Sequence, residues 1–95
     1  MTILVIYDIS SDKSRKKIAD RLLDIGMIRA QLSVFIGTVE SNRLDEIALF
    51  AEELLTDSDR LYILPITRDN LRSARIVGQG FDEELVTDEV LTMVI

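Results

Sequence analysis

Asp8 is the residue of this sequence best suited to do chemistry, because it is a carboxylate inside the nearly continuous apolar run Ile3–Ile9. A carboxylate at the end of a buried strand is costly unless it is paired, caps a helix or binds a metal ion. The residues alone leave two interpretations open, a helix cap or Asx turn and a metal ligand. Asp12 is a second carboxylate nearby, but with Ser10 and Ser11 it forms an ordinary set of helix-capping residues.

The composition restricts the chemistry of any site. The chain of 95 residues contains no histidine and no cysteine. This excludes histidine bases, Ser-His and Cys-His arrangements, thiolate metal sites and disulfides. Any metal site must use oxygen ligands, which favours magnesium or manganese.

The charge is distributed unevenly. Residues 1–80 contain all 11 basic and 12 of the 17 acidic side chains, whereas residues 81–95 contain five acidic side chains and no basic one. The nearly neutral body has one basic cluster, formed by Lys13, Arg15, Lys16, Lys17 and Arg21. Such a cluster can contact phosphate even in an acidic protein. The alternative is that it is a solvated helix face.

The elements that position these residues follow from periodicity. Residues 3–9 are rich in β-branched side chains and predict a central strand buried on both faces. A helix is expected after the capping residues, because Ile18, Leu22 and Ile25 form one apolar face. Gly26 is a suitable residue to end that helix.

Residues 27–39 alternate between apolar and polar positions, which predicts one bent strand or two short ones. Arg29, Gln31, Ser33 and Phe35 fall on one parity. The polar members either contact a phosphate or fill a polar dimer interface, and Phe35 is expected to pack.

The rest of the chain predicts a second helix capped by Ser41 or Asn42 and a strand over residues 61–66. A turn is expected over residues 67–70, followed by a short strand over residues 74–77. The order βαββαβ is typical of the α+β ferredoxin-like sandwich, whose helices cover one face of an antiparallel sheet. The open face makes a homodimer the default expectation.

We expect one ferredoxin-like domain over residues 1–80, including the extra C-terminal strand, and an acidic extension over residues 81–95. The extension either adds a strand or is a disordered end. The N-terminal sequence MTILVIYD lacks a basic segment and its apolar run is too short to span a membrane. We therefore expect a cytoplasmic protein.

Two segments together resemble the CRISPR-associated protein two family, the ferredoxin-like partner of the integrase in spacer acquisition. They are VIYDIS at residues 5–10 and RAQLSVFIG at residues 29–37, with Gly26 between them. The segment ARIVGQG at residues 74–80 looks like the exchanged C-terminal strand of the family. The resemblance covers residues 1–80.

The resemblance implies that Asp8 matches the family's strand-end aspartate, two of which, from two protomers, bind one divalent metal ion. Arg29 and the segment Ser33–Phe35 match the family's arginine and Ser-Val-Phe. The sequence departs from the pattern at Ile36, where many members have an acidic residue, and it lacks the cysteines that some members have after the fourth strand. Neither departure affects the expected metal site.

The functional hypothesis is a divalent-metal-dependent endonuclease that hydrolyses RNA or DNA phosphodiesters, with Asp8 binding Mg²⁺ or Mn²⁺ and a metal-activated water as nucleophile. Lys13, Arg15, Lys16 and Arg29 are expected to bind the backbone, with Gln31, Ser33 and Phe35 supporting the site or dimer. The alternative is a non-catalytic dimeric scaffold that binds duplex DNA and bridges integrase subunits. A third hypothesis, from the fold alone, is a small-molecule regulatory domain.

Overall fold

The computed structural model of the protein describes residues 1–78. In chain order these residues form β1 (Thr2–Asp8), α1 (Asp12–Asp24), β2 (Ile28–Gln31), β3 (Val34–Thr38), α2 (Ser41–Leu54), β4 (Arg60–Pro65) and α3 (Arg68–Ser73). The order confirms the predicted α+β, ferredoxin-like βαββαβ pattern.

The acidic extension predicted for residues 81–95 lies outside the described residues. Within the described part, no helix has the length and apolar character needed to cross a membrane.

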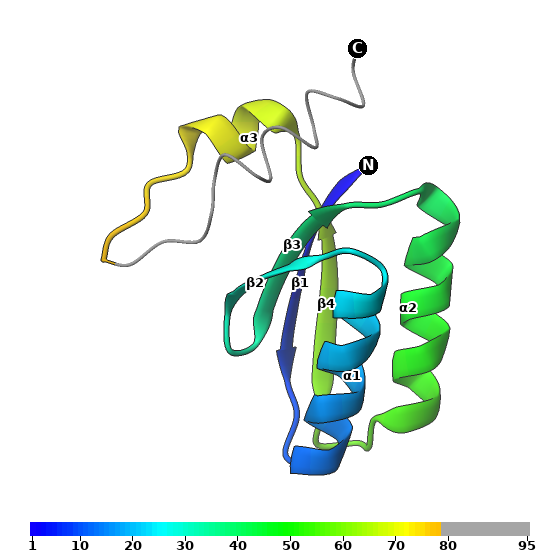
Figure 1. The fold of residues 1–95 in the computed structure, drawn as a ribbon. Helices are drawn as coiled ribbons and strands as arrows, with labels where there is room; N and C mark the ends of the chain where they lie inside the picture. Colours follow the sequence, from blue (N-terminus) through cyan, green and yellow to red (C-terminus); the bar gives the residue numbers. More distant parts are fainter. Residues whose placement is uncertain (79–95) are drawn as a thin grey trace.

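The sheet has the order β2-β3-β1-β4, and every neighbouring pair is antiparallel. β1 is therefore a central strand, as predicted. Helices α1 and α2 lie side by side on one face of the sheet (Figure 1). The core lies between these layers, where Ile3, Val5 and Phe35 are fully buried beneath Ile18 and Leu22 of α1.

The opposite face of β1 and β4 is apolar and only partly buried. The register aligns Leu4 with Leu64 and Ile6 with Tyr62. Tyr62 and Leu64 retain 51% and 44% of their accessible surface. Asp8 has the same parity as Leu4 and Ile6 on β1, so its side chain belongs to this face. We call it the open face.

The ends of α1 agree with the prediction from sequence. The Ser11 side chain accepts a hydrogen bond of 3.3 Å from the backbone N–H of Ser14, which caps the helix. Gly26 has a φ of +91°, a left-handed conformation that favours glycine. For α2 the prediction was wrong by a residue or two, because the N-cap is Glu40 and its side chain makes no capping bond.

The segment after β4 differs from the prediction. The turn expected over residues 67–70 is the start of α3, which Thr67 caps by accepting a hydrogen bond of 3.0 Å from Asn70 N–H. The strand expected over residues 74–77 is not formed in the single chain, where Val77 is 96% exposed. A strand needs a partner for its backbone groups, and the described residues supply none for this segment.

β2 and β3 are two short strands joined by a turn at Leu32 and Ser33. Arg29 is aligned with Phe35, but a register irregularity then aligns Gln31 with Val34. Because Val34 and Phe35 point to opposite faces, Gln31 does not share the face of Arg29 and Phe35. The prediction of one common polar face was therefore wrong for Gln31.

Candidate functional site

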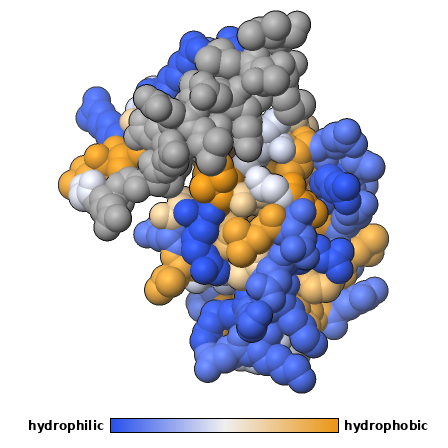
Figure 2. All heavy atoms as spheres, in the orientation of Figure 1, coloured by the Kyte–Doolittle hydropathy of each residue, from blue (hydrophilic) through white to orange (hydrophobic). Residues whose placement is uncertain are grey.

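A groove of about 640 Å³ lies between α1 and the β2–β3 hairpin, at the end of β1. Five of the residues singled out from sequence line it, and they come from three separate segments of the chain: Asp8, Arg15, Lys16, Arg29 and Ser33. Figure 1 places the start of α1 at the lower end of the molecule, and Figure 2 shows that this end of the visible face is predominantly hydrophilic. The fold therefore brings together charged and polar residues that are far apart in the sequence.

Three other predicted residues do not line the groove. Lys13 is exposed elsewhere on α1, and Gln31 is separated by the register irregularity. Phe35 is fully buried in the core and is not a surface residue. Phe35 supports the side chain of Arg29 from the core, because the Arg29 guanidinium lies over its ring, 5.0 Å from the ring centroid.

Tyr7 fixes the hairpin turn against the end of β1. Its phenol donates a hydrogen bond of 3.1 Å to the Leu32 carbonyl, and its backbone N–H donates one of 3.1 Å to the Ser33 carbonyl. Its ring lies near that of Phe35, with centroids 6.3 Å apart. Tyr7 is buried, so the turn is held beside Asp8 by a rigid aromatic side chain.

Arg15 has a structural role that the sequence did not reveal. Its guanidinium donates hydrogen bonds to the carbonyls of Ile9, at 2.8 Å, and Ser10, at 3.4 Å, and forms an ion pair with Asp12. These groups hold the β1–α1 junction together. Substituting Arg15 therefore changes the loop as well as the charge of the groove.

The charges around the groove are partly paired among themselves. Arg15 pairs with Asp12, and Lys16 contacts Asp20 at 2.7 Å. The other two charged residues of the groove, Asp8 and Arg29, form no ion pair within residues 1–78. Both are exposed, so one acidic and one basic group remain accessible to a ligand.

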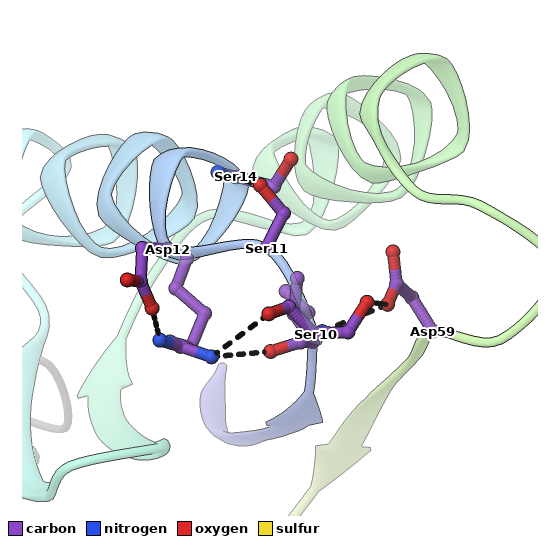
Figure 3. Close-up of polar contacts among 7 residues, drawn as sticks. Ser10, Ser11, Asp12, Ser14 and Asp59 are labelled. Carbon is purple, nitrogen blue, oxygen red and sulfur yellow. Dashed lines mark hydrogen bonds and ion pairs between the residues drawn. The ribbon is translucent and has the colours of Figure 1, made fainter.

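Asp59, which precedes β4, clamps the loop that follows Asp8. One carboxylate oxygen, Oδ1, accepts hydrogen bonds from the backbone N–H and the hydroxyl of Ser10, at 2.9 and 3.0 Å. The other, Oδ2, accepts from the N–H and hydroxyl of Thr56, both at 3.0 Å. Figure 3 shows Ser10 and Asp59 facing each other beside the start of α1. The clamp fixes the direction in which the chain leaves β1.

The donors around Asp59 stabilise its charged form. The backbone N–H groups of Thr56 and Ser10 lower its pKa from 3.8 to about 2. A carboxyl group whose pKa is lowered by folding stabilises the native state above its ordinary pKa. That contribution is lost as the pH falls from about 4 through about 2.

We expect Asp59→Asn to lower the melting temperature at pH 7, because an amide can accept at one oxygen only and leaves one pair of donors unmatched. The difference from the wild type is expected to shrink between pH 4 and pH 2. Thermal denaturation followed by circular dichroism measures both effects. The matched control is Asp57→Asn in the same loop, since Asp57 makes no hydrogen bond within the described residues. A constant difference from pH 7 to pH 2 contradicts the assignment.

Asp8 has the donor chemistry that a hard divalent cation requires. Its carboxylate oxygens are exposed and accept no hydrogen bond from the described residues. Magnesium is often held by only one or two protein carboxylates, with water completing its coordination. Within residues 1–78, no three acidic side chains lie close enough together to hold a metal ion alone. One chain thus offers a single carboxylate to a cation at this position.

Comparison with known proteins points to the same family as the two sequence segments. Residues 1–74 match the family described as CRISPR associated protein Cas2. A curated relative from Korarchaeum cryptofilum (strain OPF8), named CRISPR-associated endoribonuclease Cas2, is 35% identical over 81 residues. The match covers 84% of this chain and 87% of the relative.

Two solved structures share the fold. The hypothetical protein TT1823 from Thermus thermophilus superposes with a TM-score of 0.71 at 32% identity, over 83% of this chain and 92% of that protein. Streptococcus pyogenes Cas2, crystallised at pH 6.5, also superposes with a TM-score of 0.71, at 23% identity, over 82% of this chain and the whole of that chain. This second similarity concerns the fold alone.

Proposed function

Because the chain belongs to the CRISPR-associated Cas2 family, we propose that it is a divalent-metal-dependent endonuclease that hydrolyses RNA or DNA phosphodiesters as a homodimer. The observation that carries this proposal is the placement of Asp8. Its exposed carboxylate lies on the open face at the end of a central strand, and the residue lines one groove with Arg29 and Lys16. An oxygen ligand beside basic groups suits a cation and the phosphate that it contacts.

The homodimer is proposed from the open face. Tyr62 and Leu64 are exposed there, and Leu4 and Ile6 are only half-buried. A two-fold interface joins the same surface of both copies. Because Asp8 ends the strand at the centre of this face, packing of two open faces brings two Asp8 carboxylates toward one axis.

In this mechanism the protein binds and orients its ligands. The two Asp8 carboxylates would hold Mg²⁺ or Mn²⁺, and Arg29 and Lys16 would bind the phosphate backbone. When bound, the cation supplies a nucleophile from water at neutral pH and stabilises the charge that develops on the phosphate. Tyr7 and Asp59 keep the hairpin turn and the loop after Asp8 in place.

Cleavage assays with the full chain test this function. We expect cleavage of single-stranded RNA or duplex DNA with Mg²⁺ or Mn²⁺, and none with EDTA. If neither polymer is cleaved with either cation, the nuclease proposal fails. A non-catalytic scaffold is then the favoured function.

A second candidate function is a role in CRISPR adaptation as a scaffold that binds duplex DNA and bridges integrase subunits. The basic side chains of the groove favour it, because contacts to phosphate position a duplex without reading its sequence. This function does not require Asp8. Spacer acquisition that persists in Asp8→Ala but is lost when groove charges are reversed supports the scaffold alone.

We expect the double variant Lys16→Gln/Arg29→Gln to bind nucleic acid more weakly at every salt concentration. Each phosphate contact contributes about 0.9 to the slope of log K against log salt on duplex DNA, so the slope is expected to fall by about 2. Fluorescence anisotropy over a salt series measures this slope. Lys17→Gln is the control, because Lys17 is exposed on α1 but does not line the groove. An equal change in slope for the control shows that the groove is not the binding site.

A further inference from the structure

Arg60 lies directly across the sheet from Asp8. The antiparallel register of β1 and β4 ends on the pair Asp8 and Arg60. Residues opposite each other on antiparallel strands point to the same face, with Cβ atoms about 4.5–5.5 Å apart. Fifty-one residues of chain separate the two partners, so only the register of the folded sheet brings them together.

Both side chains are exposed, and no ion pair joins them within the described residues. The guanidinium of Arg60 forms no hydrogen bond to the described residues either, whereas that of Arg15 is bound to two carbonyls. Arg60 therefore differs from Arg15 in having its donors accessible from solvent in the single chain. In such a pair the carboxylate can bind a cation and the accessible guanidinium can bind an anion, so the two together suit a ligand made of both.

The backbone that carries Arg60 is well fixed. The preceding residue, Asp59, is bound to Ser10 on one side and Thr56 on the other. Ser10 follows Asp8 by two residues, so the clamp joins the two strand ends that carry the pair. The two hydrogen bonds between Ser10 and Asp59 therefore connect the strand ends that carry Asp8 and Arg60.

We propose that Arg60 is a substrate-contacting residue, which donates hydrogen bonds to the non-bridging oxygens of the phosphodiester bound at Asp8. This inference rests on the proposed function. Arginine matches phosphate through two parallel N–H groups, and the contact is charge-assisted. A phosphate that approaches the Asp8 carboxylate also needs positive charge on that face, and Arg60 is the basic residue aligned with Asp8.

The role of Arg60 depends on the cation. Without a cation, the negative charge of Asp8 repels a phosphate that approaches Arg60. A cation on Asp8 neutralises that carboxylate and leaves the guanidinium to bind phosphate. Arg60 takes no part in proton transfer, because its guanidinium stays protonated in proteins.

The test compares Arg60→Gln and Arg60→Lys with the control Arg72→Gln in the full chain. Arg72 is exposed on α3, which follows the opposite end of β4. The affinity for a fluorescein-labelled RNA oligonucleotide and for a labelled DNA duplex is measured by anisotropy, with Ca²⁺ and with EDTA. Thermal denaturation of each variant reports stability separately.

We expect Arg60→Gln to raise Kd about 10- to 100-fold with Ca²⁺, with a much smaller change in EDTA. Arg60→Lys is expected to recover part of the affinity, and Arg72→Gln to resemble the wild type. A lower melting temperature with unchanged Kd overturns the proposal and leaves a structural cross-strand pair. Because binding is measured without cleavage, failure of the nuclease function appears separately, as a wild-type chain that binds but does not cut.

Discussion

The Asp8→Asn variant is expected to fold normally and to lose about 10³-fold in the rate of metal-dependent cleavage. Asparagine has nearly the same shape as aspartate but carries no charge, and it is a poor ligand for a hard cation. Loss of the cation removes several kcal/mol of stabilisation from the transition state, and each 1.36 kcal/mol is a factor of ten in rate. The measurement is the cleavage rate at saturating Mg²⁺ or Mn²⁺, together with the melting temperature.

The matched control for this variant is Asp24→Asn. Asp24 is an exposed residue at the end of α1, so its substitution makes the same change in charge outside the groove. We expect the control to cleave at the wild-type rate. If the Asp8→Asn protein is folded and cleaves at the wild-type rate, Asp8 is not the metal ligand.

The double variant Tyr62→Glu/Leu64→Glu is expected to be monomeric and inactive in cleavage. Both side chains are exposed on the open face, so charges there cost little in a single chain. In a dimer that buries this face, the same charges are removed from water without partners, which is strongly unfavourable. Light scattering after size-exclusion chromatography measures the mass, and the cleavage assay measures the consequence.

An exposed leucine elsewhere provides the control for this second variant. Leu49 on α2 is 59% exposed and lies on the other side of the molecule from the open face. Leu49→Glu is expected to leave both the mass and the activity unchanged. If the double variant stays dimeric and Leu49→Glu dissociates, the interface is formed by the helices and not by the open face.

Most of the fold was predictable because the sequence patterns that indicate its helices and strands lie within short segments. The apolar run that forms β1, the capped helix α1 and the alternating pattern of β2 and β3 are each visible within a short window of sequence. The helix α3 was missed because Thr67 begins it by accepting a hydrogen bond from the Asn70 N–H, which is also how a polar turn begins. The strand expected over residues 74–77 is a different case, since a strand is defined by a partner as well as by its own sequence.

The candidate site was predictable only in part. Asp8, Lys16 and Arg29 were found from residue type and from the family resemblance, and the fold brings them into one groove. Asp59 was missed because its contact with Ser10 spans 49 residues, and nothing in the local sequence indicates it. Arg60 depends in the same way on the register of β1 and β4, which sequence periodicity does not specify.

The separation of Gln31 from Arg29 has a similar cause. Strict alternation places the two residues on one face, but one irregularity in the hairpin reverses the assignment. The sequence also did not indicate that Arg15 holds the β1–α1 junction together. Arg15 was expected to bind the nucleic-acid backbone, which stays a prediction, and its guanidinium in addition binds the carbonyls of Ile9 and Ser10.

The number of divalent cations bound per chain directly tests whether two Asp8 carboxylates share one cation. Titration of the full chain with Mn²⁺, followed by electron paramagnetic resonance of the free ion, gives this number. We predict one tightly bound Mn²⁺ per two chains, and none in the Asp8→Asn variant. One ion per chain, or binding that survives in Asp8→Asn, would contradict a cation shared by two Asp8 carboxylates.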